Sequence, residues 1–152
     1  MFKRIKVEKM KYKNDSISYA LVLLSLVVNI LYFANLYKNN AQFYYTIEMG
    51  MSVLYNLIFM LGVFMCAEFI KKYNRNYAIA TFVLGIMQIV RIFNYPLDAL
   101  KEGALSQGNY NQLVIFLVIS GALLIAGSII SFVNSTLLKE YVAGRLKVKE
   151  EE

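Results

Sequence analysis

The fold is decided by a stretch near the end of the chain, residues 112–138, which reads QLVIFLVISGALLIAGSIISFVNSTLL. It contains no charged residue, and it is longer than the roughly 20 residues that an α-helix needs to cross the hydrocarbon of a bilayer. Three more apolar blocks precede it, at about 17–37, 47–70 and 77–95. Strands of a membrane β-barrel are about 10 residues long and alternate in polarity, so these continuous blocks predict helices.

The composition of the 152 residues is unlike that of a soluble domain. Hydrophobic residues make up 59% of the chain and charged residues 17%, whereas about 25% of the residues in a typical soluble domain are charged. A soluble protein this apolar would lack the polar side chains needed to cover its surface. We therefore predict an all-α integral membrane protein, a four-helix bundle in which short connections make successive helices antiparallel in an up-down topology.

The basic residues are distributed unevenly between the segments that flank the apolar blocks. Thirteen of the sixteen Lys and Arg residues fall in 1–16, in the connection after the second block, and in 139–152. These segments share one side of the membrane if every block spans it, and only Lys38 and Lys101 fall on the other side. The positive-inside rule then predicts a multi-pass cell-membrane protein with both termini in the cytoplasm.

The predicted organisation has three parts. Residues 1–16 form a basic cytoplasmic segment, 17–138 form the transmembrane domain with a short outer-surface segment at 96–111, and 139–152 form a charged cytoplasmic tail. The net charge of +6 is explained by this topology and by attraction to anionic membrane lipids. A nucleic-acid partner is therefore not expected.

Polar residues recur within each block at spacings of three, four or seven positions, which places them on one face of each helix. Since lipid cannot satisfy a polar group, these faces should turn into the bundle. Folding each helical hairpin about its middle brings Asn29, Asn56 and Arg91 to one level in the outer half of the membrane, with Gln88 one turn deeper.

Arg91 is the residue that most needs an explanation, because an arginine at the centre of a membrane helix costs roughly 2.5–3.5 kcal/mol on insertion scales. One hypothesis is an outward-facing polar pocket in which Arg91 binds a small anionic solute or a lipid headgroup. The predicted binding residues of that pocket are Arg91, Asn29, Asn56, Gln88, Tyr32, Tyr55, Tyr95 and Glu48. The alternatives are that Arg91 extends to the outer headgroups, or that it pairs with Glu48.

The fourth block also carries small residues at a spacing of four, which are Ala122 with Ala126 and Gly127 with Ser131. Such pairs allow two helices to approach closely. Packing within the bundle is the simpler interpretation of this pattern, and packing against another protein is the alternative.

The sequence offers no catalytic or cofactor-binding set. It has no His and a single Cys, Cys66, so it lacks the commonest metal ligand and general base, and it has no phosphate-binding loop or nucleophile motif. We therefore expect a protein that is not an enzyme and holds no cofactor or metal. The first functional hypothesis is a non-catalytic subunit or accessory component of a membrane assembly, whose partner is another membrane protein or a second copy. The second is a binding or transport protein that uses the polar residues around Arg91.

Overall fold

The computed structural model describes the backbone of residues 10, 13–39, 47–101, 103 and 105–144, and the side chains of these residues except 37–39, 47–49 and 95. Helices account for nearly all of this part of the chain. They are α2 (Ser16–Asn39), α3 (Ile47–Ile70), α4 (Arg75–Val90), the short 3₁₀ helix η1 (Arg91–Phe93), α5 (Tyr95–Lys101) and α6 (Gln107–Val142).

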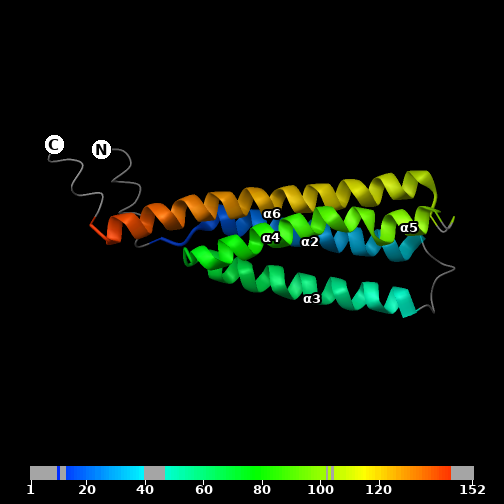
Figure 1. The fold of residues 1–152 in the computed structure, drawn as a ribbon, viewed down its shortest axis with the longest axis horizontal. Coiled ribbons are helices and arrows are strands. Elements are labelled where there is room, and N and C mark those ends of the chain that lie inside the picture. Colours follow the sequence, from blue (N-terminus) through cyan, green and yellow to red (C-terminus); the bar gives the residue numbers. More distant parts are fainter. Residues whose placement is uncertain (1–9, 11–12, 40–46, 102, 104, 145–152) are drawn as a thin grey trace.

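The helices lie side by side in one elongated bundle (Figure 1). α2 and α4 both pack along α6, and α3 lies against α2 and α4. The chain reverses direction between successive long helices, so the turn at 71–74 lies at one end of the bundle and the start of α6 lies at the other. These two ends are called the turn end and the α5 end below.

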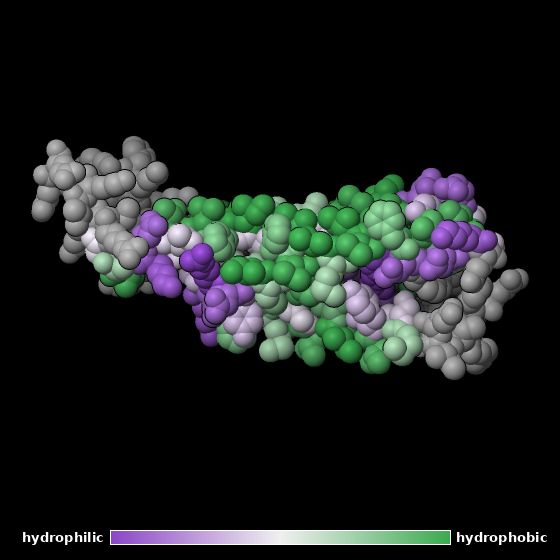
Figure 2. All heavy atoms as spheres, viewed as in Figure 1, coloured by the Kyte–Doolittle hydropathy of each residue, from purple (hydrophilic) through white to green (hydrophobic). Residues whose placement is uncertain are grey.

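Four stretches of the described chain are long and apolar enough to cross a membrane. They are Ser16–Leu36, Gly50–Ile70, Arg75–Lys101 and Gln107–Val142. Apolar residues cover the middle of the face seen in Figure 2, and hydrophilic residues gather toward its two ends. The prediction of an all-helical chain with four apolar spans is therefore confirmed.

The third span is interrupted where the apolar block is continuous in sequence. α4 ends at Val90, η1 carries Arg91, and α5 follows with Pro96 in its first turn, where the missing N–H of a proline costs no helical hydrogen bond. The start of α4 is set by Asn74, whose side chain accepts a hydrogen bond from the backbone N–H of Asn76 at 3.1 Å, as an N-cap residue does.

α6 is longer than the block that predicts it. It begins at Gln107 because Ser106 caps it, with Oγ accepting a hydrogen bond from the backbone N–H of Asn109 at 3.3 Å. It continues through Lys139 to Val142, and the chain leaves the helix at Gly144, whose φ of 76° is easily adopted by glycine.

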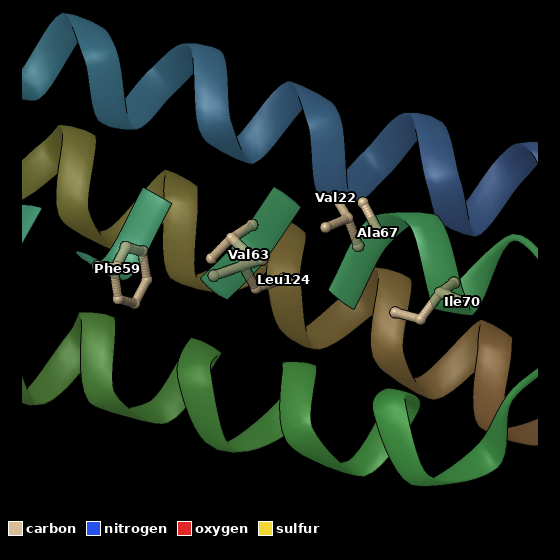
Figure 3. Packing of buried hydrophobic residues seen from close by; sticks show 6 residues of the cluster. All are labelled: Val22, Phe59, Val63, Ala67, Ile70 and Leu124. Atoms are coloured by element: carbon tan, nitrogen blue, oxygen red, sulfur yellow. The ribbon is translucent and has the colours of Figure 1, made fainter. Parts of the chain in front are cut away.

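Two apolar clusters fill the interior at different levels. The turn-side cluster lies between α2, α3 and α6 (Figure 3) and consists of Val22, Phe59, Val63, Ala67, Ile70 and Leu124. The α5-side cluster joins α2, α5 and α6, and consists of Tyr32, Leu36, Ala99, Leu105, Leu113 and Leu117. The predicted polar residues Asn29, Asn56, Gln88 and Arg91 lie between the levels of these two clusters.

Glycines bring α6 close to its neighbours. A Cβ atom on Gly121 would lie 2.7 Å from Cγ1 of Ile89 and 3.1 Å from the carbonyl oxygen of Gly85, so α4 and α6 touch at this pair. A Cβ atom on Gly127 would lie 3.0 Å from Cγ2 of Val22 on α2. These positions carry glycine because the helix backbones meet there.

The two small pairs predicted on the fourth helix behave differently. Gly127 and Ser131 are buried, which agrees with packing inside the bundle. Ala122 and Ala126 instead lie on the exposed face of α6, away from the other described helices.

Candidate functional site

Arg91 is buried, with 5% of its surface exposed. Its Nη1 donates a hydrogen bond to Oδ1 of Asn56 on α3 at 2.5 Å. Its guanidinium carbon lies 4.8 Å from the ring centroids of both Tyr32 and Tyr55, within the range of cation–π attraction. The side chain therefore points between α2 and α3 and is enclosed there, unlike the alternative in which it extends to the outer headgroups.

A second polar pair lies beside the first. Nε2 of Gln88 on α4 donates a hydrogen bond to Oδ1 of Asn29 on α2 at 2.7 Å, and both side chains are almost completely buried. Gln88 precedes Arg91 by three positions, and Asn29 precedes Tyr32 by three, so each partner lies one helical turn from the arginine contacts. We call Asn29, Tyr32, Tyr55, Asn56, Gln88 and Arg91 the polar layer.

The polar layer has more buried hydrogen-bond donors than acceptors to receive them. Native proteins leave few buried polar atoms without a partner. In and beside the layer, the buried side-chain atoms without a hydrogen-bond partner are Nη2 of Arg91, Nδ2 of Asn29, Nδ2 of Asn56, Oγ of Ser52 and Oε1 of Gln88. Three of these five atoms only donate, one hydroxyl can donate, and a single carbonyl oxygen accepts. The complement to this set is a group rich in acceptors.

No acidic side chain neutralises Arg91 among the residues that the structure describes. The ion pairs found in that part of the chain join Lys71 to Glu68 and Lys101 to Asp98. The side chains of Glu48 and Tyr95, both predicted to belong to the site, lie outside the described residues. Their roles, including the alternative of an Arg91–Glu48 pair, stay predictions.

A cavity of about 420 Å³ adjoins the polar layer. It opens between α3 and α4, and we call it the α3–α4 groove. Its lining residues are Ser52, Tyr55, Ile86, Met87, Val90, Arg91 and Asn94. The volume lies within the range of about 300–1,000 Å³ that is usual for small-molecule sites.

The position of the groove differs from the outward-facing pocket expected from the sequence. Between α2, α5 and α6, the space above the polar layer is filled by Leu36, Leu113 and Leu117 of the α5-side cluster. The groove instead runs along the side of the bundle, where Ile86 and Val90 are exposed. The groove therefore offers a lateral approach to Arg91 between α3 and α4.

Of the seven groove residues only Tyr55 and Arg91 were predicted to bind, and the polar residues missed are Ser52 and Asn94. Ser52 precedes Asn56 by four positions on the same face of α3, so its spacing carries a usable signal. Asn94 follows η1, and its placement depends on that break in the helix, which the apolar pattern does not reveal.

A separate polar cluster ties the helices together at the turn end. Asp15 is buried, and its carboxylate accepts hydrogen bonds from Oγ of Ser18 at 2.8 Å and from Nδ2 of Asn134 at 3.2 Å. Its backbone N–H donates to the carbonyl oxygen of Lys71 at 3.1 Å. Burial and the nearby Asp15 carboxylate raise the pKa of Tyr73. Both of the side-chain bonds to Asp15 go to Oδ2, and Oδ1 accepts a third from the backbone N–H of Ser18 at 3.3 Å. Because both carboxylate oxygens have partners, we interpret this cluster as a structural cap.

In the described part of the chain, no group of three or more His, Cys, Asp or Glu side chains is placed to hold a metal ion. A scan against protein-family models and searches of curated proteins and of solved structures found no match to this chain.

Proposed function

We propose that this chain is a multi-pass cell-membrane protein, with four transmembrane helices and both termini in the cytoplasm, that binds an anionic group at Arg91. One observation carries the proposal. Arg91 is a buried cation that has no acidic partner among the described residues, its Nη2 has no hydrogen-bond partner there, and the residue lines the α3–α4 groove.

The membrane orientation is supported by the charges at the two ends. Lys71, Lys72 and Arg75 flank the turn end, and the sequence pattern predicts thirteen of the sixteen basic residues on the same side of the membrane as this turn, which positive-inside placement assigns to the cytoplasm. At 1.5 Å per helical residue, Arg91 lies about 24 Å from the start of α4. In a hydrocarbon layer about 30 Å thick, the polar layer then falls in the outer half.

An anion is favoured by the charge and by the donors. Leaving one charge buried without a partner is strongly unfavourable, and an anionic group in the groove relieves that cost. Asn56 holds Nη1 of Arg91, which orients the guanidinium and leaves Nη2 to bind a phosphate or carboxylate oxygen. Charge-assisted hydrogen bonds of this kind are about twice as strong as neutral ones.

The test measures the thermal unfolding of the purified protein in a neutral detergent, with inorganic phosphate or acetate added at constant ionic strength. A ligand at ten times its Kd should stabilise the wild type by about 1.4 kcal/mol. Arg91→Gln should abolish the stabilisation, and Arg91→Lys should retain part of it. Lys101→Gln is the matched control, since it removes an exposed positive charge that already pairs with Asp98.

The control variant should respond to the anions as the wild type does. Circular dichroism checks that each variant remains helical before the anions are compared. An equal response of the wild type and Arg91→Gln to both anions would falsify anion binding at Arg91.

A second candidate function is membership of a membrane assembly, favoured by the exposed pair Ala122 and Ala126 on α6. Two small residues one turn apart let another helix approach closely, and both are exposed in the described part of the chain. Cysteine crosslinking in native membranes tests this candidate. Ala122→Cys should crosslink to a second copy or to another membrane protein more efficiently than the control Ile58→Cys, which is exposed on α3, and monomer alone from both variants argues against it.

A further inference from the structure

The α3–α4 groove changes in polarity along its length. Arg91, Ser52 and Asn94 lie toward its α5 end, and Ile86 and Met87 lie more than one helical turn closer to the turn end. Ile86, Met87 and Val90 are 44%, 43% and 53% exposed, so this wall faces outward. In the orientation proposed above, the groove is polar near the outer membrane surface and apolar toward the bilayer centre.

A phospholipid of the outer leaflet has the same order of polarity. We infer that the anionic group bound at Arg91 is the phosphate of an anionic outer-leaflet lipid, which reaches the groove sideways from the bilayer. Its acyl chain then lies along Ile86 and Met87, between α3 and α4. This inference rests on the proposed function, because it names the class of anion that Arg91 binds.

The shape of the site favours a lipid over a small water-soluble anion. The cavity of about 420 Å³ is much larger than an inorganic anion requires, and it accommodates a phosphate together with the beginning of an acyl chain. A soluble anion would leave the apolar wall unused and would have to cross lipid to reach a lateral opening. A lipid of the surrounding bilayer, by contrast, is already next to a lateral opening.

The depth of Arg91 also fits a lipid phosphate. The residue lies about 24 Å from the start of α4, which is about 6 Å below the outer edge of a 30 Å hydrocarbon layer. An outer-leaflet phosphate therefore descends by about one helical turn to meet the guanidinium. An anionic headgroup is favoured over a choline headgroup, because choline would bring a second positive charge near Arg91.

The absence of tryptophan from the sequence allows a direct test. Val90→Trp places a single tryptophan at the rim of the groove. Val118→Trp is the control, since Val118 is exposed on α6, a helix that does not line the groove. The two positions lie at similar levels, because Gly121, one turn from Val118, touches Ile89 of α4.

Each variant is placed in phosphatidylcholine nanodiscs that contain a tenth of brominated phosphatidylglycerol or, in parallel, of brominated phosphatidylcholine. Bromine quenches tryptophan only at short range. Quenching at position 90 should show that phosphatidylglycerol is about fivefold more concentrated beside the groove than in the bulk lipid. One basic residue attracts an anionic lipid by roughly 1 kcal/mol, which corresponds to this ratio. Brominated phosphatidylcholine should quench both positions equally.

Adding Arg91→Gln to Val90→Trp should remove the enrichment, and adding Lys101→Gln should preserve it. Native mass spectrometry is the second measurement, because it needs no tryptophan at position 90, where the new side chain would hide lipid binding if it filled the groove. Phosphatidylglycerol should remain bound to the wild type and be lost from Arg91→Gln.

Equal quenching at positions 90 and 118, together with no retained phosphatidylglycerol in the wild type, overturns the lipid inference. Enrichment that survives Arg91→Gln also overturns it, since the lipid then binds elsewhere. If inorganic phosphate still stabilises the wild type but not Arg91→Gln, the proposed anion site stands and only the lipid is wrong. If the response to phosphate is absent as well, both proposals fall.

Discussion

Replacing Gly121 with alanine inserts a methyl group between α6 and α4. The new Cβ would lie 2.7 Å from Cγ1 of Ile89 and 3.1 Å from the carbonyl oxygen of Gly85. The isoleucine side chain can rotate, but the backbone oxygen moves only if the helices separate. Overpacking of this kind typically costs about 1–3 kcal/mol.

A matched control isolates this cost from the helix propensity of alanine. Gly62 lies in α3, and a Cβ atom there would meet nothing within 4 Å. Both Gly121→Ala and Gly62→Ala gain the same propensity, up to about 1 kcal/mol in a helix interior. The free energies of unfolding of the two variants should therefore differ by about 1–3 kcal/mol, with Gly121→Ala the less stable.

The measurement is equilibrium unfolding in mixed micelles of a neutral detergent and dodecyl sulfate, followed by circular dichroism. Adding Ile89→Ala to Gly121→Ala should recover part of the loss, because it removes one of the two clashes. If the two glycine variants differ by less than about 0.5 kcal/mol, the usual range for surface substitutions, then α4 and α6 do not meet at Gly121.

Three further predictions test other parts of the structure. Gln88→Ala leaves the buried Oδ1 of Asn29 without its donor, so unfolding in the same assay should become easier by about 1–3 kcal/mol. Burial and Asp15 raise the pKa of Tyr73 above its ordinary value of 10.0, so the folded state keeps the phenol proton better than the unfolded state does. The resulting stability is present below pH 10 and should fall as the pH rises further, and Tyr73→Phe should flatten that fall in unfolding measured against pH. In the proposed orientation, Lys72→Cys should react with a membrane-impermeant maleimide only after cells are opened, and reaction in intact cells would contradict a cytoplasmic turn end.

The number of helices and the level of the polar side chains could be predicted because a bilayer restricts both. An apolar block of sufficient length without charges has few alternatives to a spanning helix. Spacing by three and four residues then determines which side chains share a face. These rules predict Asn29, Asn56 and Arg91 at one level with Gln88 one turn deeper, but they do not predict which side chains pair, and the hydrogen bonds Asn29–Gln88 and Asn56–Arg91 are known only from the structure.

The opening beside Arg91 could not be predicted, because it depends on distances between helices. Gly85 and Gly121 draw α4 against α6, and the groove lies on the α3 side of α4. The apolar pattern of the sequence around Gly85 and Gly121 does not reveal this contact between the two helices. The break at Arg91–Phe93 is hidden for the same reason, since the apolar residues continue through it.

The arrangement of two apolar clusters around one buried arginine also bears on ion leakage. A cation that moved along the centre of the membrane-inserted bundle would first meet Val22, Val63 and Leu124, which are completely buried and offer no ligand. It would then approach the guanidinium of Arg91, and two like charges 4 Å apart repel by about 4 kcal/mol at an effective dielectric constant of 20. If the bundle spans the membrane as proposed, these buried apolar side chains and the charge of Arg91 both oppose the passage of protons and metal cations along its centre. An anion site of the proposed kind would then be open to the bilayer without a cation path through the described interior.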